Sequence, residues 1–197
     1  MSVRESWSRI AAWAEANIPP NEFRLAAGAT EQQIADLETL LGFPLPEDVR
    51  ESYQIHNGTD ETVFPGWPTD GDFPCYPAYG ELVTLEYMGS MYKLHREFEL
   101  AKGAAEIVTP EIKPVQWSSR RLVLTDDASG SGLRVDLDPA EAGTFGQILH
   151  HDRSFGPIKV ISPSWAALLQ RIADDIDAGL YYYSEDLTWS RKDDPNQ

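Results

Sequence analysis

The 197-residue sequence has little of what would assign it to a membrane or to an oxidising compartment. Cys75 is its single cysteine, so no disulfide can form within the chain, and nothing points to secretion. No apolar run approaches the roughly 18 residues that cross a bilayer, and the N-terminus lacks the apolar segment of a signal peptide. We therefore expect a cytoplasmic protein with no membrane partner.

Basic residues are also scarce. Lys and Arg number 16 against 32 Asp and Glu, which gives a formal net charge of −16. Because nucleic-acid binding normally needs clustered Lys and Arg, the charge argues against a nucleic-acid partner. Two interpretations of the acidity remain open, namely attraction to a basic protein partner and simple solubility.

The spacings typical of catalysis and metal binding are missing. There is no His-x-x-x-His, Cys-x-x-Cys, Gly-x-Ser-x-Gly or dinucleotide fingerprint. His150 and His151 would point to opposite faces of a strand, so they cannot share one ion without a bulge. Asp136 and Asp138 would share a face and suit a metal or an acid/base pair, yet Asp before Pro139 is also typical of a turn. We favour the turn, and we expect no catalytic residue, metal or cofactor.

The stretch from Gly28 to Gly58 carries the strongest pattern in the chain. Thr30 and Gln33 have the spacing of a capping box, and Gly42 suits the left-handed residue that ends a helix. Between them, apolar residues recur at helical spacing. These residues are Ile34, Leu37 and Leu41. The pattern predicts a helix that ends near residue 42.

A second helix is predicted immediately afterwards. Pro46 suits the first helical position, and Val49 with Tyr53 forms an apolar stripe. The triplet His56–Gly58 closes the helix, where we expect His56 to satisfy the carbonyl groups at the helix end. The two helices therefore form a hairpin with a short connection.

The other segments predict an α+β protein. We expect a first helix over 3–17, a strand over 81–87, a helix over 88–102, and a last helix capped by Ser162 with Pro163 at its first position. An antiparallel meander is predicted between them. Its strands are 112–117, 121–125, 133–137, 145–150 and 158–161. The sequence predicts one domain over 1–180, with helices packed on a mostly antiparallel sheet, and an aromatic and charged tail over 181–197.

A long segment with neither helical nor strand periodicity connects the predicted helical hairpin to the rest of the chain. Residues 59–80 contain four prolines and three glycines, but they are too aromatic for a disordered linker. The rings either cap one end of the core or form, with the acidic residues, a surface for a basic partner. On the second interpretation the partner-binding residues are Asp60, Glu61, Phe64, Trp67, Asp70, Asp72, Tyr76 and Tyr79.

Three blocks of the sequence resemble one known family. The run Leu-Gly-Phe-Pro-Leu-Pro-Glu-Asp at 41–48, followed by Tyr53 and the triplet His56–Gly58, is similar to the Smi/Knr-type cell-wall assembly regulators of the SUKH superfamily. Residues 136–148 and the helix after Ser164 fit the same pattern. The resemblance implies a SUKH-like α+β domain without established catalytic residues. Bacterial relatives resemble immunity proteins that neutralise toxins, often nucleases, whereas fungal relatives regulate cell-wall synthesis and signalling.

These observations predict a non-enzymatic protein-binding module. Our first hypothesis is a bacterial immunity protein whose acidic surface binds a basic toxin, possibly a nuclease. The alternative is a regulatory or scaffolding protein of the same superfamily. A third hypothesis is an enzyme that uses acidic residues on a small molecule or a glycan.

Overall fold

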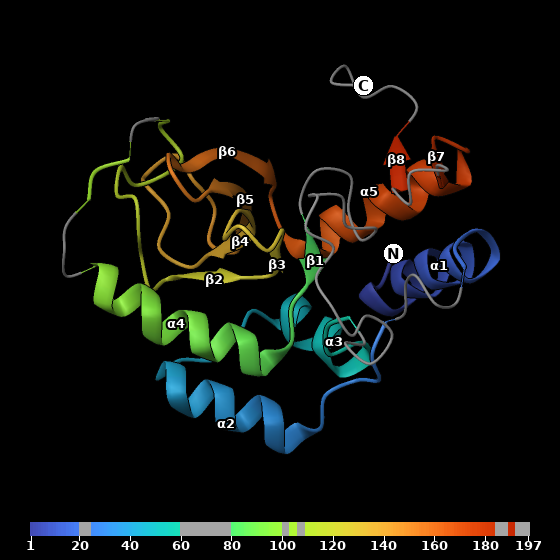
Figure 1. Cartoon of the computed structure of the whole chain (residues 1–197), viewed down its shortest axis with the longest axis horizontal. Helices are drawn as coiled ribbons and strands as arrows, with labels where there is room; N and C mark the ends of the chain where they lie inside the picture. Colours follow the sequence, from blue (N-terminus) through green and yellow to red (C-terminus); the bar gives the residue numbers. More distant parts are fainter. Residues whose placement is uncertain (20–24, 60–79, 100–102, 106–108, 184–188, 192–197) are drawn as a thin grey trace.

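The computed structural model describes residues 1–19, 25–59, 80–99, 103–105, 109–183 and 189–191. These residues form five α-helices and three antiparallel sheets (Figure 1). The protein is therefore α+β, as predicted. None of the described helices has the length and apolar character needed to cross a membrane.

The first three helices begin and end close to where the sequence predicts. Helix α1 (Val3–Asn17) is capped by Ser2, and α2 (Glu31–Leu41) starts with the predicted capping box of Thr30 and Gln33. Gly42 ends α2 with a φ of 78°, in the left-handed region. Helix α3 (Glu47–Ile55) starts one residue later than expected, because Pro46 is extended and precedes the helix.

Helix α4 (Leu85–Glu99) replaces part of a predicted strand. Only β1 (Glu81–Leu82) is extended, so the prediction of a strand over 81–87 is wrong for most of its length. The reason is capping: Thr84 Oγ1 accepts a hydrogen bond from the backbone N–H of Tyr87 at 3.1 Å. The alternating apolar residues of this segment predicted a strand, but residues from Leu85 onward belong to the helix that Thr84 caps.

The predicted meander forms the main sheet. Its strands are β2 (Arg121–Val123), β4 (Gly132–Asp136), β5 (Gln147–Asp152) and β6 (Gly156–Ser162), and they lie in the order β2-β4-β5-β6. The two other sheets each pair two strands. They are β1 with β3 (Thr125–Asp126) and β7 (Tyr181–Tyr183) with β8 (Trp189–Arg191).

The predicted strand over 112–117 does not form. Its main pairing is an isolated bridge between Val115 and Ala104. The buried guanidinium of Arg121 donates instead to the carbonyl oxygens of Val115 and Lys113, at 2.6 and 2.7 Å. The side chain therefore satisfies backbone acceptors that a neighbouring strand would otherwise have paired.

Helix α5 (Trp165–Asp177) joins α1 and α3 through one hydroxyl group. The indole N–H groups of Trp7 and Trp165 both donate to Ser52 Oγ, at 2.8 and 2.9 Å. The start of α5 differs from the prediction, because Ser164 rather than Ser162 accepts from the N–H of Ala167. Pro163 accordingly precedes the helix.

Helix α4 lies between the main sheet and α2 (Figure 1). The connection between α2 and α3 is short, as predicted, and at the other end of the pair Gln54 Nε2 donates to Glu31 Oε1 at 2.5 Å. The apolar faces of the two helices, however, pack against different elements. Helix α2 packs on α4, and α3 packs on α1 and α5. This divergence leaves one side of the α2–α4 pair open.

Candidate partner-binding groove

The partner-binding residues predicted from the sequence lie outside the described residues. All eight fall within 60–79. They are Asp60, Glu61, Phe64, Trp67, Asp70, Asp72, Tyr76 and Tyr79. Their role in binding stays a prediction.

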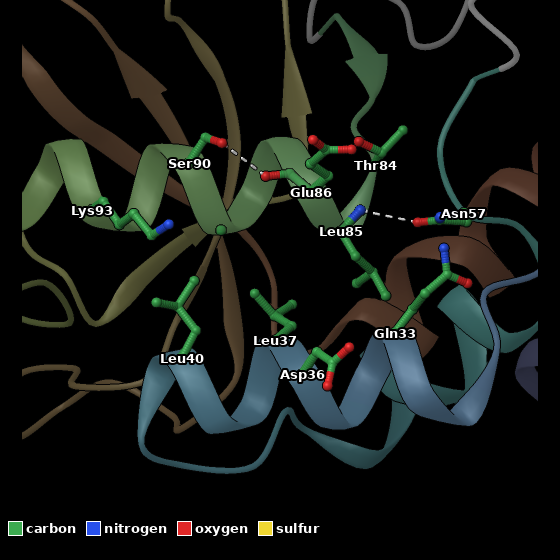
Figure 2. Close-up of a pocket in the computed structure, with 11 residues that line it drawn as sticks. Gln33, Asp36, Leu37, Leu40, Asn57, Thr84, Leu85, Glu86, Ser90 and Lys93 are labelled. Carbon is green, nitrogen blue, oxygen red and sulfur yellow. Dashed lines mark hydrogen bonds between the residues drawn. The ribbon is translucent and has the colours of Figure 1, made fainter.

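The described residues contain a different candidate, a groove of about 520 Å³ between α2 and α4 (Figure 2). The two helices lie side by side and run in the same direction. Helix α2 contributes Gln33, Asp36, Leu37 and Leu40; α4 contributes Leu85, Glu86, Gly89, Ser90 and Lys93; Asn57 and Thr84 lie at one end. We call this feature the α2–α4 groove.

A glycine sets the depth of the α2–α4 groove. An added Cβ at Gly89 would lie 3.1 Å from Leu40 Cδ2 and 3.3 Å from Leu37 Cδ1, so a larger residue would require these two leucine side chains to move. Leu37 is buried, whereas Leu40 is 38% exposed. The floor is therefore apolar and partly open to solvent.

The rim of the groove is polar, and its charge differs between the two ends. Asp36 and Glu86 lie toward the end at which both helices begin, and Lys93 lies toward the other end (Figure 2). All three side chains are exposed. Within the described part of the chain, neither Glu86 nor Lys93 forms an ion pair. These two charges are therefore available to a ligand.

The triplet His56–Gly58 positions α4 beside α2. Asn57 Oδ1 accepts a hydrogen bond from the first backbone N–H of α4, that of Leu85, at 2.9 Å. Gly58 has a φ of 86°, and a Cβ there would lie 2.8 Å from the backbone nitrogen of Thr84. The close approach and the backbone conformation both require glycine. The block on which the family resemblance rests thus builds one end of the groove.

His56 has a structural role that differs in detail from the prediction. Its Nδ1 donates to the carbonyl oxygen of Ala26 at 3.0 Å, and its ring meets the edge of Trp7. The expectation that His56 satisfies carbonyls at its own helix end is therefore wrong. The side chain instead ties the end of α3 to the segment before α2.

The chain bends at residues 137 and 138, as the turn interpretation predicts, but Asp136 rather than Asp138 accepts the backbone N–H. Asp136 Oδ1 accepts from the backbone N–H of Asp138 at 3.2 Å. Asp136 is fully buried with Arg121 Nε 3.9 Å away, while Asp138 pairs with Lys113 at the surface. Burial raises the pKa of Asp136, and the charge of Arg121 opposes that rise. The two carboxylates therefore have separate partners.

His150 and His151 occupy different environments, as predicted for neighbours on a strand. His150 is half-buried, whereas His151 is buried with its ring 4.9 Å from that of Trp117. Trp117 also contacts His95, at 5.0 Å between ring centres. Burial, with a contribution from the Arg134 charge, lowers the pKa of His151 to about 2 and that of His95 to about 4. Both rings are therefore neutral core residues near pH 7.

The sequence reasoning missed the α2–α4 groove, although two signals were present. Leu40 lies outside the apolar stripe of its helix, and an apolar residue on an otherwise polar helix face can indicate a contact surface. Gly89 stands inside a helix, where glycine costs about 1 kcal/mol relative to alanine and needs a reason such as close packing. The parallel approach of two helices far apart in sequence was not predictable from either signal.

Comparison with known proteins gives a consistent family match. The model of the SMI1 / KNR4 family (SUKH-1) matches residues 28–171. The chain is 31% identical over 191 residues to the cell wall biosynthesis/cell cycle regulator smi1 of Schizosaccharomyces pombe, covering 93% of this chain and 38% of that protein. It is 28% identical over 216 residues to the glucan synthesis regulatory protein of Neurospora crassa, covering 93% of this chain and 40% of that protein.

Two further relatives are more distant or match a shorter part of the chain. The cell wall assembly regulator SMI1 of Saccharomyces cerevisiae is 24% identical over 216 residues, which cover 92% of this chain and 42% of the relative. Human F-box only protein 3 is 34% identical over 65 residues, which cover 33% of this chain and 14% of that protein. The chain thus spans less than half the length of the fungal relatives that it matches.

Proposed function

The chain belongs to the SMI1/KNR4 family (SUKH-1), and on this premise we propose that it is a regulatory module that acts by binding another protein. The process that we propose for it is the control of cell-wall glucan synthesis. Its action is binding without catalysis.

The observation that carries this proposal is the extent of the similarity. Two fungal proteins named as regulators of glucan synthesis and of cell-wall biosynthesis match 93% of this chain. The similarity therefore includes the helices that form the α2–α4 groove, and it is not confined to a short motif. The groove supplies an open surface of the kind that a binding module needs.

The names of the relatives favour the regulatory interpretation over an immunity protein. The printed names refer to cell-wall regulation and not to toxins. The net charge of −16 still supports neutralisation of a basic toxin as a second candidate function. An enzyme receives less support from the α2–α4 groove, because its lining includes neither histidine nor cysteine and its carboxylates are exposed.

A chimaera tests the regulatory function directly. The segment of the Schizosaccharomyces pombe relative that matches this chain would be replaced by the chain, in cells that lack the native copy. We expect the chimaera to restore growth in the presence of a glucan-digesting enzyme. Failure to restore growth at normal expression would contradict the regulatory proposal.

The second candidate function has its own readout. The chain would be co-expressed in bacteria with nuclease toxins encoded next to genes of bacterial SUKH proteins. Protection of these cells, together with failure of the chimaera, would favour an immunity protein. Restored growth without protection would favour the regulator.

A further inference from the structure

The shape of the α2–α4 groove restricts what can occupy it. Its lining spans residues 33–40 on α2 and 85–93 on α4, and the charged rim of α4 extends from Glu86 to Lys93. Seven residue steps at 1.5 Å each give about 10 Å, or two helical turns. The backbone polar groups along both walls are bonded within their own helices, so an extended strand would find no edge to pair with. Side-chain packing of a third helix into the groove fits this geometry.

The exposure of the lining separates this groove from a small-molecule cavity. Small-molecule sites usually enclose most of the surface of their ligand. Here six lining residues are exposed, and the floor itself opens at Leu40. They are Gln33, Asp36, Leu40, Glu86, Ser90 and Lys93. An open apolar floor with a polar rim is typical of a surface that binds part of another protein.

The charges on the rim determine which helix is complementary. Asp36 and Glu86 make one end acidic, and Lys93 makes the other end basic. Glu86 and Lys93 are seven residues apart on α4. A helix that lies along α4 would therefore match both ends if it carried a basic and an acidic side chain about seven residues apart. Its net charge is expected to be positive, because the whole chain has a charge of −16.

We propose that the α2–α4 groove binds a short amphipathic helix of a basic partner protein. Apolar side chains three or four residues apart in that helix pack on Leu37 and Leu40. Its basic side chain lies beside Asp36 and Glu86, and its acidic side chain lies beside Lys93. This inference rests on the proposed function, since it names the kind of partner segment that the regulatory module binds.

The test is a selection from a phage-displayed library of random 14-residue peptides, carried out on the full chain. Leu40→Asp removes the apolar floor at an exposed site, and Leu94→Asp is its matched control. Leu40 and Leu94 are 38% and 37% exposed, on neighbouring helices, but Leu94 does not line the groove. We expect the selected peptides to bind Leu40→Asp at least about tenfold more weakly than the native chain, and Leu94→Asp within about twofold.

The sequences and orientation of the selected peptides test the charge pattern. We expect apolar residues at helical spacing, with a basic and an acidic residue about seven positions apart. A nitroxide label on the basic end of a selected peptide should broaden the NMR amide signal of residue 86 of the chain more than that of residue 93. In the variant with Glu86→Lys and Lys93→Glu, the order should reverse. Glu97→Lys with Lys159→Glu makes the same charge changes at exposed sites outside the groove and should leave the order unchanged.

Three outcomes would overturn the inference. The selection yields no binder, the selected peptides lack helical spacing, or they bind Leu40→Asp as well as the native chain. If any of these occurs while the chimaera restores growth, the regulatory function stands and the groove is not its helix-binding site. If the selected peptides bind as expected but the chimaera fails, the site stands and its assignment to wall regulation is wrong.

Discussion

Charged groups lie in opposite surroundings on the two sides of α4. Toward α2, Glu86 and Lys93 are exposed on the rim of a groove. Toward the sheet, Arg134 is 1% exposed and donates to the carbonyl oxygens of Thr125 and Gly130, each at 2.9 Å. Burial lowers the pKa of Arg134 to about 10, although the charge of Asp126 opposes this.

The contrast shows where a functional site should be sought in this protein. Strongly shifted pKa values often mark active sites, but buried structural networks shift them as well. Here the two histidines with strongly lowered pKa values, His95 and His151, are core residues packed around Trp117. The charged groups that are free to meet a partner, Glu86 and Lys93, lie on an open surface.

The largest expected effect comes from breaking the buried network. Arg134→Ala leaves Asp126 without its cation and leaves buried carbonyl groups unsatisfied, so we expect a loss of about 3–5 kcal/mol in the free energy of unfolding. Arg153→Ala is the control, because Arg153 is exposed and its side chain makes a long hydrogen bond, of 3.4 Å, to the carbonyl oxygen of Ser129. Urea unfolding measures both variants. A similar loss in the two would mean that burial of Arg134 carries no special stabilisation.

A smaller effect is expected at the joint that positions the groove. Gly58→Ala adds a Cβ 2.8 Å from the backbone of Thr84 at a φ of 86°, and we expect a loss of at least about 2 kcal/mol. Gly42→Ala has a similar φ of 78° but no atom within 4 Å, so only about 1 kcal/mol should be lost. Thermal unfolding would separate the two. Equal losses would show that conformational strain matters and the close approach does not.

Acid should destabilise the interior through its histidines. The folded pKa values of about 4 for His95 and about 2 for His151 lie below the ordinary value, so the folded state binds fewer protons than the unfolded state. Stability from these groups is therefore complete above about pH 6.5 and falls as the pH decreases, by about 1.4 kcal/mol per pH unit for each histidine. Replacing both residues by Leu should flatten the dependence measured by urea unfolding between pH 7 and 5.

The buried carboxylates act in the opposite direction. Burial raises the pKa values of Asp126 and Asp136, so the folded state takes up their protons more readily and gains relative stability as the pH falls. The difference between the native chain and the double Leu variant isolates the histidine contribution. An unchanged slope in that variant would contradict the assignment of the acid sensitivity to His95 and His151.

The smallest effect on stability is expected at the groove itself. Leu40→Asp and Leu94→Asp both alter exposed side chains, so each should change the free energy of unfolding by no more than about 0.5 kcal/mol. The two variants should nevertheless differ in binding. A large loss of stability in Leu40→Asp would place that residue in the core and remove the contrast between the two faces of α4.

Local patterns predicted much of the fold. The capping box at Thr30 and the end of α2 at Gly42 both depend on interactions within a few residues, and the structure confirms them. The meander was predictable because short apolar runs alternate with turn residues. These features are local, so the sequence contains all that is needed to find them.

Two errors have local causes, the caps of Thr84 and Ser164, whereas others arise where residues distant in the sequence decide the structure. The sequence of 112–117 is apolar enough to resemble a strand, but the guanidinium of Arg121 binds the carbonyl groups of Lys113 and Val115. The start of α4 depends on the side chain of Asn57, which is distant in sequence. The α2–α4 groove likewise depends on Gly89 meeting Leu37 and Leu40. The predicted loop site over 60–79 stays a prediction.

The most direct test of the account is the chimaera that carries this chain in the Schizosaccharomyces pombe relative, made in three versions. Growth in the presence of a glucan-digesting enzyme would be measured for the native chain, Leu40→Asp and Leu94→Asp at equal expression. We predict that the native chain and Leu94→Asp restore growth and that Leu40→Asp does not. Equal growth with all three versions would contradict a regulatory role for the α2–α4 groove, and no growth with any of them would contradict the regulatory function itself.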